Sequence, residues 1–176
     1  MFYTIQFAAF LCISPFCHKI MHSFDNTLLV SLSQIFQGIA SFLIGPSDLL
    51  SFILPDKWGV IMGGLILTGL ANTFTTIATY QEMYEPFMQR YAPLSPLHSE
   101  KLSDILSGLY NAGFSLGVIV ILGPFVGDYL TLFFGYRLQA DFMGFFGVGY
   151  GVLHMLVVYL PSVLEKRRGR KLQNSN

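Results

Sequence analysis

Charged side chains are scarce in this sequence. Only 11% of the 176 residues are Asp, Glu, Lys or Arg, whereas 53% are hydrophobic. Soluble globular domains carry about 25% charged residues, so this composition favours lipid over water as the solvent. The ten basic side chains equal the ten acidic ones in number, which leaves no net charge to attract nucleic acid or an acidic surface.

Cysteines and catalytic motifs are also scarce. Cys12 and Cys17 both lie in one apolar stretch, which fits neither a disulfide framework nor the paired CxxC spacing of a zinc site. His18 and His22 are four residues apart, but no glutamate follows His18 and no third ligand is near. The sequence has no HExxH, GxGD or Walker-type glycine motif. We therefore expect no enzyme, no cofactor and no metal site.

Long apolar runs dominate the chain instead. The charge-free runs after the first are long enough to cross a hydrocarbon core of about 30 Å as helices. Lipid offers no partner to a free backbone N–H or C=O, and no period-2 alternation suggests strands, so helices are favoured. The predicted fold class is all-α, a polytopic membrane helix bundle with five transmembrane helices. The charge-free runs are 1–17, 26–47, 58–81, 105–127 and 142–164.

The breaks between these runs define the predicted boundaries. Asp25 is the expected N-cap of the second span. Segment 83–102 holds Pro86, Pro93 and Pro96 together with four charged residues, so we predict an aqueous loop there. A turn over 132–137 separates the last two spans. The predicted transmembrane bundle covers 1–164, with spans over 1–20, 26–54, 58–82, 103–131 and 139–164, followed by a basic tail over 165–176.

Basic residues are distributed unevenly between the two sides of the predicted bundle. The tail carries five of them within 166–171, and Lys19, Arg90 and Lys101 fall on the same side. Only Lys57 and Arg137 fall on the other side. By the positive-inside rule the tail is cytoplasmic and the N-terminus lies on the opposite face of the membrane.

Several polar side chains lie inside the predicted spans, where an unpaired polar group is energetically unfavourable. Asn72 and Thr76 in the third span, and Asn111 and Ser115 in the fourth, are candidates for binding a solute in a central cavity. The alternative for the asparagines is a hydrogen bond to a neighbouring helix, and for the threonines a bond to their own backbone.

Two ionisable groups are candidates for proton coupling. His154 lies inside the fifth span, and imidazole is the side chain that ordinarily exchanges a proton near neutral pH. Asp128 follows Gly127 towards the outer end of the fourth span. The alternative for His154 is a packing role, and for Asp128 solvation at the interface. Asp48, Asp104 and Asp141 fall at span ends, where we expect them to be in water.

Glycines recur at helical spacing. Three pairs of glycines lie four positions apart, so each pair shares one helix face, which predicts close helix packing. Pro124 lies mid-span after Gly123 and should kink the fourth helix because it removes a backbone hydrogen bond. The pairs are Gly113 with Gly117, Gly123 with Gly127 and Gly147 with Gly151.

Segment 102–117, of sequence LSDILSGLYNAGFSLG, resembles the eleventh helix of major facilitator transporters, and 121–127 and 134–137 continue the likeness. It looks closest to the vesicular amine and polyamine branch of the drug:proton antiporters. Segment 64–72 is similar to the tenth helix of that family. The sequence carries Asp128 where the family pattern has the second glycine of a pair. The resemblance implies a partial major facilitator fold, helices eight to twelve.

The resemblance implies a transporter for small organic solutes, among them cationic ones. It would move the solute by alternating access and couple this movement to protons. The chain would then lack the first half of that fold and would be a fragment, or would work beside other membrane subunits. The alternative is a structural membrane subunit whose glycine faces pack against partner helices and through which no solute passes. The other expected partner is the lipid bilayer.

Overall fold

Helices make up nearly all of the chain that can be described. The computed structural model describes residues 2–21, 24–45, 58–91, 96–116, 127 and 129–164. No strand occurs among these residues, so the prediction of an all-α bundle is confirmed. The elements are α1 (Phe2–Met21), α2 (Asn26–Ile44), α3 (Trp58–Tyr91), α4 (Pro96–Leu116), α5 (Tyr129–His154) and the π-helical continuation of α5, η3 (Met155–Tyr159).

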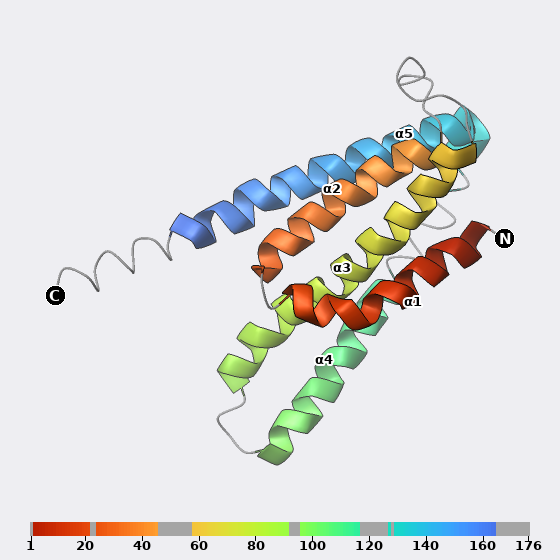
Figure 1. Ribbon diagram of the computed structural model, residues 1–176. Helices are drawn as coiled ribbons and strands as arrows, with labels where there is room; N and C mark the ends of the chain where they lie inside the picture. Colours follow the sequence, from red (N-terminus) through yellow and green to blue (C-terminus); the bar gives the residue numbers. More distant parts are fainter. Residues whose placement is uncertain are drawn as a thin grey trace.

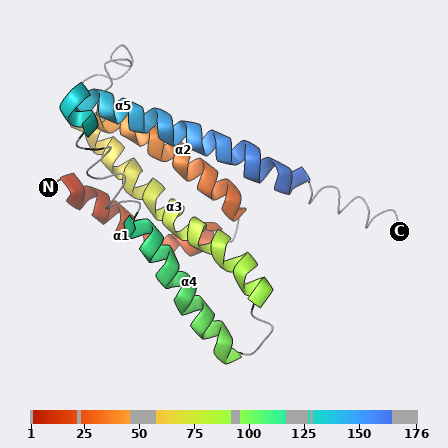
Figure 2. The same ribbon diagram turned by 180° about the vertical axis from the view of Figure 1, so that it is seen from behind.

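Helix α2 is the centre of the bundle. It lies between α3 on one side and α5 on the other, and it runs antiparallel to both (Figure 1). Helices α1 and α4 both contact α3, and the view from behind shows α4 following the half of α3 that leads to Tyr91 (Figure 2). The arrangement leaves α5 with one packed face and a long open face.

Three of the helices are long and apolar enough to cross a membrane. They cover Asn26–Ile44, Trp58–Arg90 and Tyr129–Leu164, while α1 has a shorter apolar stretch, Thr4–Cys17. Helical backbone satisfies its N–H and C=O groups internally, which is the condition for stability in lipid. The chain is therefore a membrane-embedded helical protein.

The segment expected to be an aqueous loop is helical over most of its length. Helix α3 continues beyond 82 to Tyr91, and α4 begins at Pro96 instead of 103. The polar residues from Glu82 to Arg90 are mostly good helix formers, so polarity ends the apolar run without ending the helix. Proline suits the first position of α4, because its missing N–H has no intrahelical acceptor there.

The end of the predicted fourth span and the start of the fifth also differ from the expected bounds. Helix α4 is described as far as Leu116, and residues 117–126 and 128 lie outside the described part. Helix α5 begins at Tyr129, and Gly135 interrupts it with φ 81° and ψ 163°. Glycine adopts a positive φ without strain, so two helical pieces meet at the predicted turn.

The packed interior is small, and the exposed surface is strongly apolar. Cys17 of α1, Leu29 and Val30 of α2 and Ala78 of α3 form a buried cluster where these three helices meet. Large side chains of α5, among them Phe133 at 73% exposure, remain open. In lipid such a surface is solvated by acyl chains, whereas in water it would drive association.

Candidate functional site

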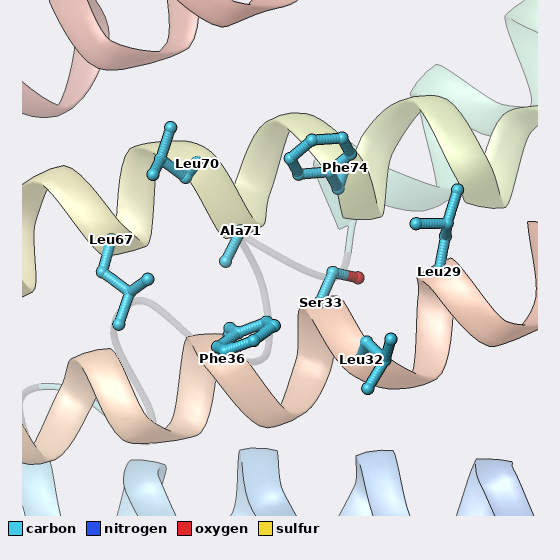
Figure 3. Close-up of a pocket in the computed structure, with 8 residues that line it drawn as sticks. All are labelled: Leu29, Leu32, Ser33, Phe36, Leu67, Leu70, Ala71 and Phe74. Atoms are coloured by element: carbon cyan, nitrogen blue, oxygen red, sulfur yellow. The ribbon is translucent and has the colours of Figure 1, made fainter. Parts of the chain in front are cut away.

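An apolar cavity of about 290 Å³ lies between α2 and α3. Figure 3 shows its lining side chains, which come from α2 and α3. Ser33 is the single hydroxyl among them. The lining residues are Leu29, Leu32, Ser33, Phe36, Leu67, Leu70, Ala71 and Phe74.

The Ser33 hydroxyl both accepts and donates a hydrogen bond within the protein. Thr75 Oγ1 donates to Ser33 Oγ at 2.9 Å, and Ser33 Oγ donates to the carbonyl of Val30 at 2.9 Å. This relay joins α3 to α2 at the wall of the cavity. The cavity therefore presents an apolar surface with its one polar group satisfied, which suits the apolar body of a molecule.

His154 is fixed to the central helix. Its Nδ1 lies 2.9 Å from Oγ of Ser31, a side chain with 0% exposure. His154 itself is partly buried and stacks against Tyr150, with ring centroids 6.1 Å apart. The predicted coupling candidate thus makes an interhelical hydrogen bond within a stretch of apolar helix.

Asp141 occupies a different environment from the expected one. The prediction that it is in water is wrong, because Asp141 is 2% exposed. Neither carboxyl oxygen has a hydrogen-bond partner among the described residues, and Gln37 Oε1 is also buried and unpartnered. Sequence position placed Asp141 at a span end, but the packing of α5 on α2 covers it. The one signal in the sequence was a carboxylate within the predicted span 139–164.

The four predicted solute-binding residues do not line the cavity between α2 and α3. Asn72 and Thr76 lie one turn apart on α3, and the Thr76 carbonyl accepts a hydrogen bond from Tyr110 of α4 at 3.3 Å. Asn111 and Ser115 on α4 are exposed. The structure thus connects α4 to α3 beside Thr76, but it does not bring the four side chains into one enclosed site.

Ser115 also stands in a Gly-x-Ser-x-Gly pattern, from Gly113 to Gly117. In α/β-hydrolases this pattern places a nucleophilic serine on a sharp turn from a strand into a helix. Here Ser115 is exposed in the last turn of α4, and the described part of the chain contains no strand. The pattern therefore lacks the structural context of a nucleophile.

Close helix packing occurs at glycines of α2 and α5. A Cβ on Gly38 would lie 2.6 Å from the carbonyl oxygen of Gly144, and one on Gly147 would lie 2.9 Å from Cα of Gly38. A Cβ on Gly151 would lie 2.8 Å from the carbonyl oxygen of Ser31. The close packing predicted for Gly147 and Gly151 is confirmed, since only glycine lets the two backbones approach this far.

The other predicted packing residues have different outcomes. At Gly113 no described residue lies within 4 Å of an added Cβ, so its face on α4 is open in the described part of the chain. Gly127 is described as partly buried. The remaining predicted positions, Gly117, Gly123, Pro124 and Asp128, lie outside the described residues. Of the candidate site residues, the structure therefore places His154 partly buried against α2, and Asn111 and Ser115 on the surface.

Within the described residues, no three His, Cys, Asp or Glu side chains lie close enough to bind a metal ion together. A search of family models, of curated proteins and of solved structures finds no match to this chain. Its own architecture defines it as an all-helical, membrane-embedded bundle with polar contacts inside apolar helices.

Proposed function

We propose that this chain is the membrane-embedded part of a transporter for small organic solutes, coupled to protons. The observation that carries the proposal is the cavity between α2 and α3, of about 290 Å³, inside a bundle of helices long enough to span a membrane. Ligand sites in helix bundles are typically concave, mostly apolar and placed between helices. The resemblance to major facilitator transporters supports the same conclusion.

The lining narrows the class of solute. None of the described residues that line the cavity is charged, and their one hydroxyl is engaged in the relay from Thr75 to Val30. A solute bound there would place an apolar body in the cavity and keep any cationic group outside it. His154, held by Ser31 on the other side of α2, is the candidate for carrying the proton.

A flux assay with a permanently charged probe tests this proposal. The full chain is reconstituted in vesicles that are acidic inside and contain a trapped pH dye, and benzyltrimethylammonium is added outside. This cation has an apolar ring and does not cross lipid unaided. We expect its entry to be accompanied by loss of internal acid, faster than in vesicles without protein.

A variant that fills the cavity tests whether the cavity carries the flux, and a second variant is its matched control. Ala71 is 3% exposed and lines the cavity, so Ala71→Phe should fill much of it and reduce the rate at least tenfold. Gly149→Ala changes a glycine with open space around it and should leave the rate unchanged. A rate equal to that of empty vesicles, or one that Ala71→Phe does not change, contradicts the proposal.

A structural subunit is the second candidate, and open glycine faces favour it. Among the described residues nothing lies within 4 Å of an added Cβ at Gly59, Gly63, Gly113 or Gly149, so these positions can receive the backbone of a partner helix. Purification in mild detergent separates the two candidates. A stoichiometric membrane partner, together with no probe flux, supports the subunit, whereas a monomer that carries flux excludes it.

A further inference from the structure

We propose that the first piece of α5, residues 129–134, is an interfacial anchor that lies in the phospholipid headgroup layer. Gly135 turns the chain from this layer into the hydrocarbon core. The basic tail follows the other end of α5, so the anchor and the tail belong to opposite faces of the membrane. The proposal does not depend on transport, because it holds equally for a carrier and for a structural subunit.

The bend at Gly135 separates the anchor from the rest of α5. The φ of 81° and ψ of 163° at this residue do not continue an α-helix. Oγ1 of Thr131 donates a hydrogen bond to Oε1 of Gln139 across the bend. In a straight helix these two residues would lie about 12 Å apart along the axis, too far for such a bond. The anchor and the longer piece of α5 therefore follow different directions.

The depth of the bend follows from the packing of α5 on α2. Helix α2 has 19 residues. Its length is therefore about 28 Å, close to the hydrocarbon core of about 30 Å. Its end meets α5 at Ala140, since a Cβ on Gly45 would overlap that of Ala140. Gly135 lies about 8 Å further along the axis of α5, which is within the headgroup layer of about 5–8 Å. A straight helix would continue from there into water, whereas a bent one can follow the layer.

The side chains of the anchor suit the headgroup layer. Leu132 is 82% exposed, and Phe133 and Phe134 are exposed beside it. Tyr129 stacks on Phe133 with ring centroids 5.9 Å apart. Aromatic and leucine side chains bind the boundary between headgroups and acyl chains, where tyrosine keeps its hydroxyl in the polar layer. The exposed apolar surface of the anchor therefore has a lipid partner at this depth.

The start of α3 brings a second aromatic side chain to the same layer. A Cβ on Gly64 would lie 2.9 Å from Cβ of Leu43, so Gly64 is level with the end of α2. Trp58 begins α3 about 9 Å further out and is 71% exposed. It is the single tryptophan of the chain. Two helices thus place exposed aromatic side chains at one depth, as in the aromatic belts of membrane proteins.

Fluorescence quenching of the full chain in phosphatidylcholine vesicles tests the proposal. The lipids carry bromine either near the headgroup or near the end of the acyl chains, and Phe133→Trp is made in a Trp58→Phe background. We expect the shallow label to quench its emission at least about twofold more strongly than the deep label. Phe146→Trp in the same background is the matched control. Phe146 is also exposed on α5 but lies about 9 Å inside the level of Ala140, so the deep label should quench more strongly there.

Three outcomes overturn the anchor. Stronger quenching of Phe133→Trp by the deep label would place the segment in the core, and quenching by acrylamide alone would place it in water. Resistance to both lipid labels and to acrylamide would mean that protein covers it, a second copy of the chain included. If Phe133→Trp does not accumulate, Leu132→Trp replaces it with the same expectations.

Two further measurements test the depth and the bend separately. Trp58 of the wild type needs no substitution, and stronger quenching of its emission by the deep label would contradict the depth assigned to this layer. Gly135→Ala disfavours the positive φ and should straighten α5. Added to the Phe133→Trp variant, it should move the reporter outwards and raise acrylamide quenching about twofold. Unchanged acrylamide quenching would contradict the role of Gly135.

Discussion

Oγ of Ser31 and Nδ1 of His154 lie 2.9 Å apart and join α2 to α5 across 123 positions of sequence. The same hydroxyl donates to the carbonyl of Thr27 at 2.9 Å. A serine hydroxyl has one proton, so both hydrogen bonds form together when Nδ1–H of His154 donates to Ser31. Nε2 is then the nitrogen of neutral His154 that is able to accept a proton.

The first prediction concerns this hydrogen bond. Ser31→Ala and His154→Phe should each destabilise the protein, and their effects should not add, because each removes the same bond. We expect a coupling free energy of about 1 kcal/mol, as for interhelical hydrogen bonds in membranes. Unfolding in mixed detergent measures it through a double-mutant cycle.

Ser41→Ala is the matched control for that cycle. Its hydroxyl also lies on α2 but bonds the Gln37 carbonyl within the same helix, at 3.1 Å. Combined with His154→Phe it should show no coupling. Additive effects of Ser31→Ala and His154→Phe would mean that the bond contributes nothing to stability.

The second prediction concerns the glycine contact between α2 and α5. Gly151→Ala would place a Cβ 2.7 Å from Cγ1 of Ile35 and 2.8 Å from the Ser31 carbonyl oxygen, so the helices must move apart. We expect a loss of about 1–3 kcal/mol in the free energy of unfolding. Gly149→Ala, two residues away with open space around it, should be neutral or slightly stabilising, since alanine favours helix.

Thermal unfolding of both variants in the same detergent compares them. Equal stability of the two alanine variants would contradict the close approach of the helices. A dimer interface at Gly149 would instead appear as a concentration-dependent effect of Gly149→Ala.

The third prediction concerns the attachment of α4. Tyr110 donates to the Thr76 carbonyl at 3.3 Å, and its ring meets that of Tyr80 edge-on with centroids 5.8 Å apart. Tyr110→Phe removes the long hydrogen bond and keeps the ring contact, so we expect a loss below about 1 kcal/mol. Tyr110→Ala removes both and should cost more, by about 0.5–1.5 kcal/mol for the aromatic pair besides the lost burial.

Hydrogen exchange of the α4 backbone measures these effects locally. Exchange in α4 should be fastest in Tyr110→Ala, intermediate in Tyr110→Phe and slowest in the wild type. Unchanged exchange in Tyr110→Ala would show that this tyrosine does not hold α4 against α3.

The fourth prediction concerns orientation in the membrane. The basic residues of the tail should keep the C-terminus in the cytoplasm and place the N-terminus outside. Epitope tags on each end, probed by protease in intact and permeabilised cells, report the two sides. Protection of both tags before permeabilisation would contradict an odd number of spans.

The residues differ in how far sequence alone predicted their surroundings. Gly147 and Gly151 pack as their spacing predicts, whereas Gly113, with the same spacing to Gly117, has open space around it in the described chain. Thr68 and Thr73 bond carbonyl groups of their own helix, which is the usual pattern for threonine in a helix, but Thr75 bonds Ser33 of α2. Periodicity shows which residues share a face, but the neighbour that covers the face is set by contacts between distant segments.

The sequence by itself determined the solvent of this protein and the helical state of its apolar runs, because the hydrophobicity of a run is a local sum and a backbone in lipid must satisfy its own hydrogen bonds. Only the tertiary structure decided which polar groups meet. Ser31 pairs with His154 and Asp141 is sealed from water because α2 and α5 approach closely along their glycines. The close approach of α2 and α5 depends on contacts between residues about a hundred positions apart, which no local sequence pattern encodes.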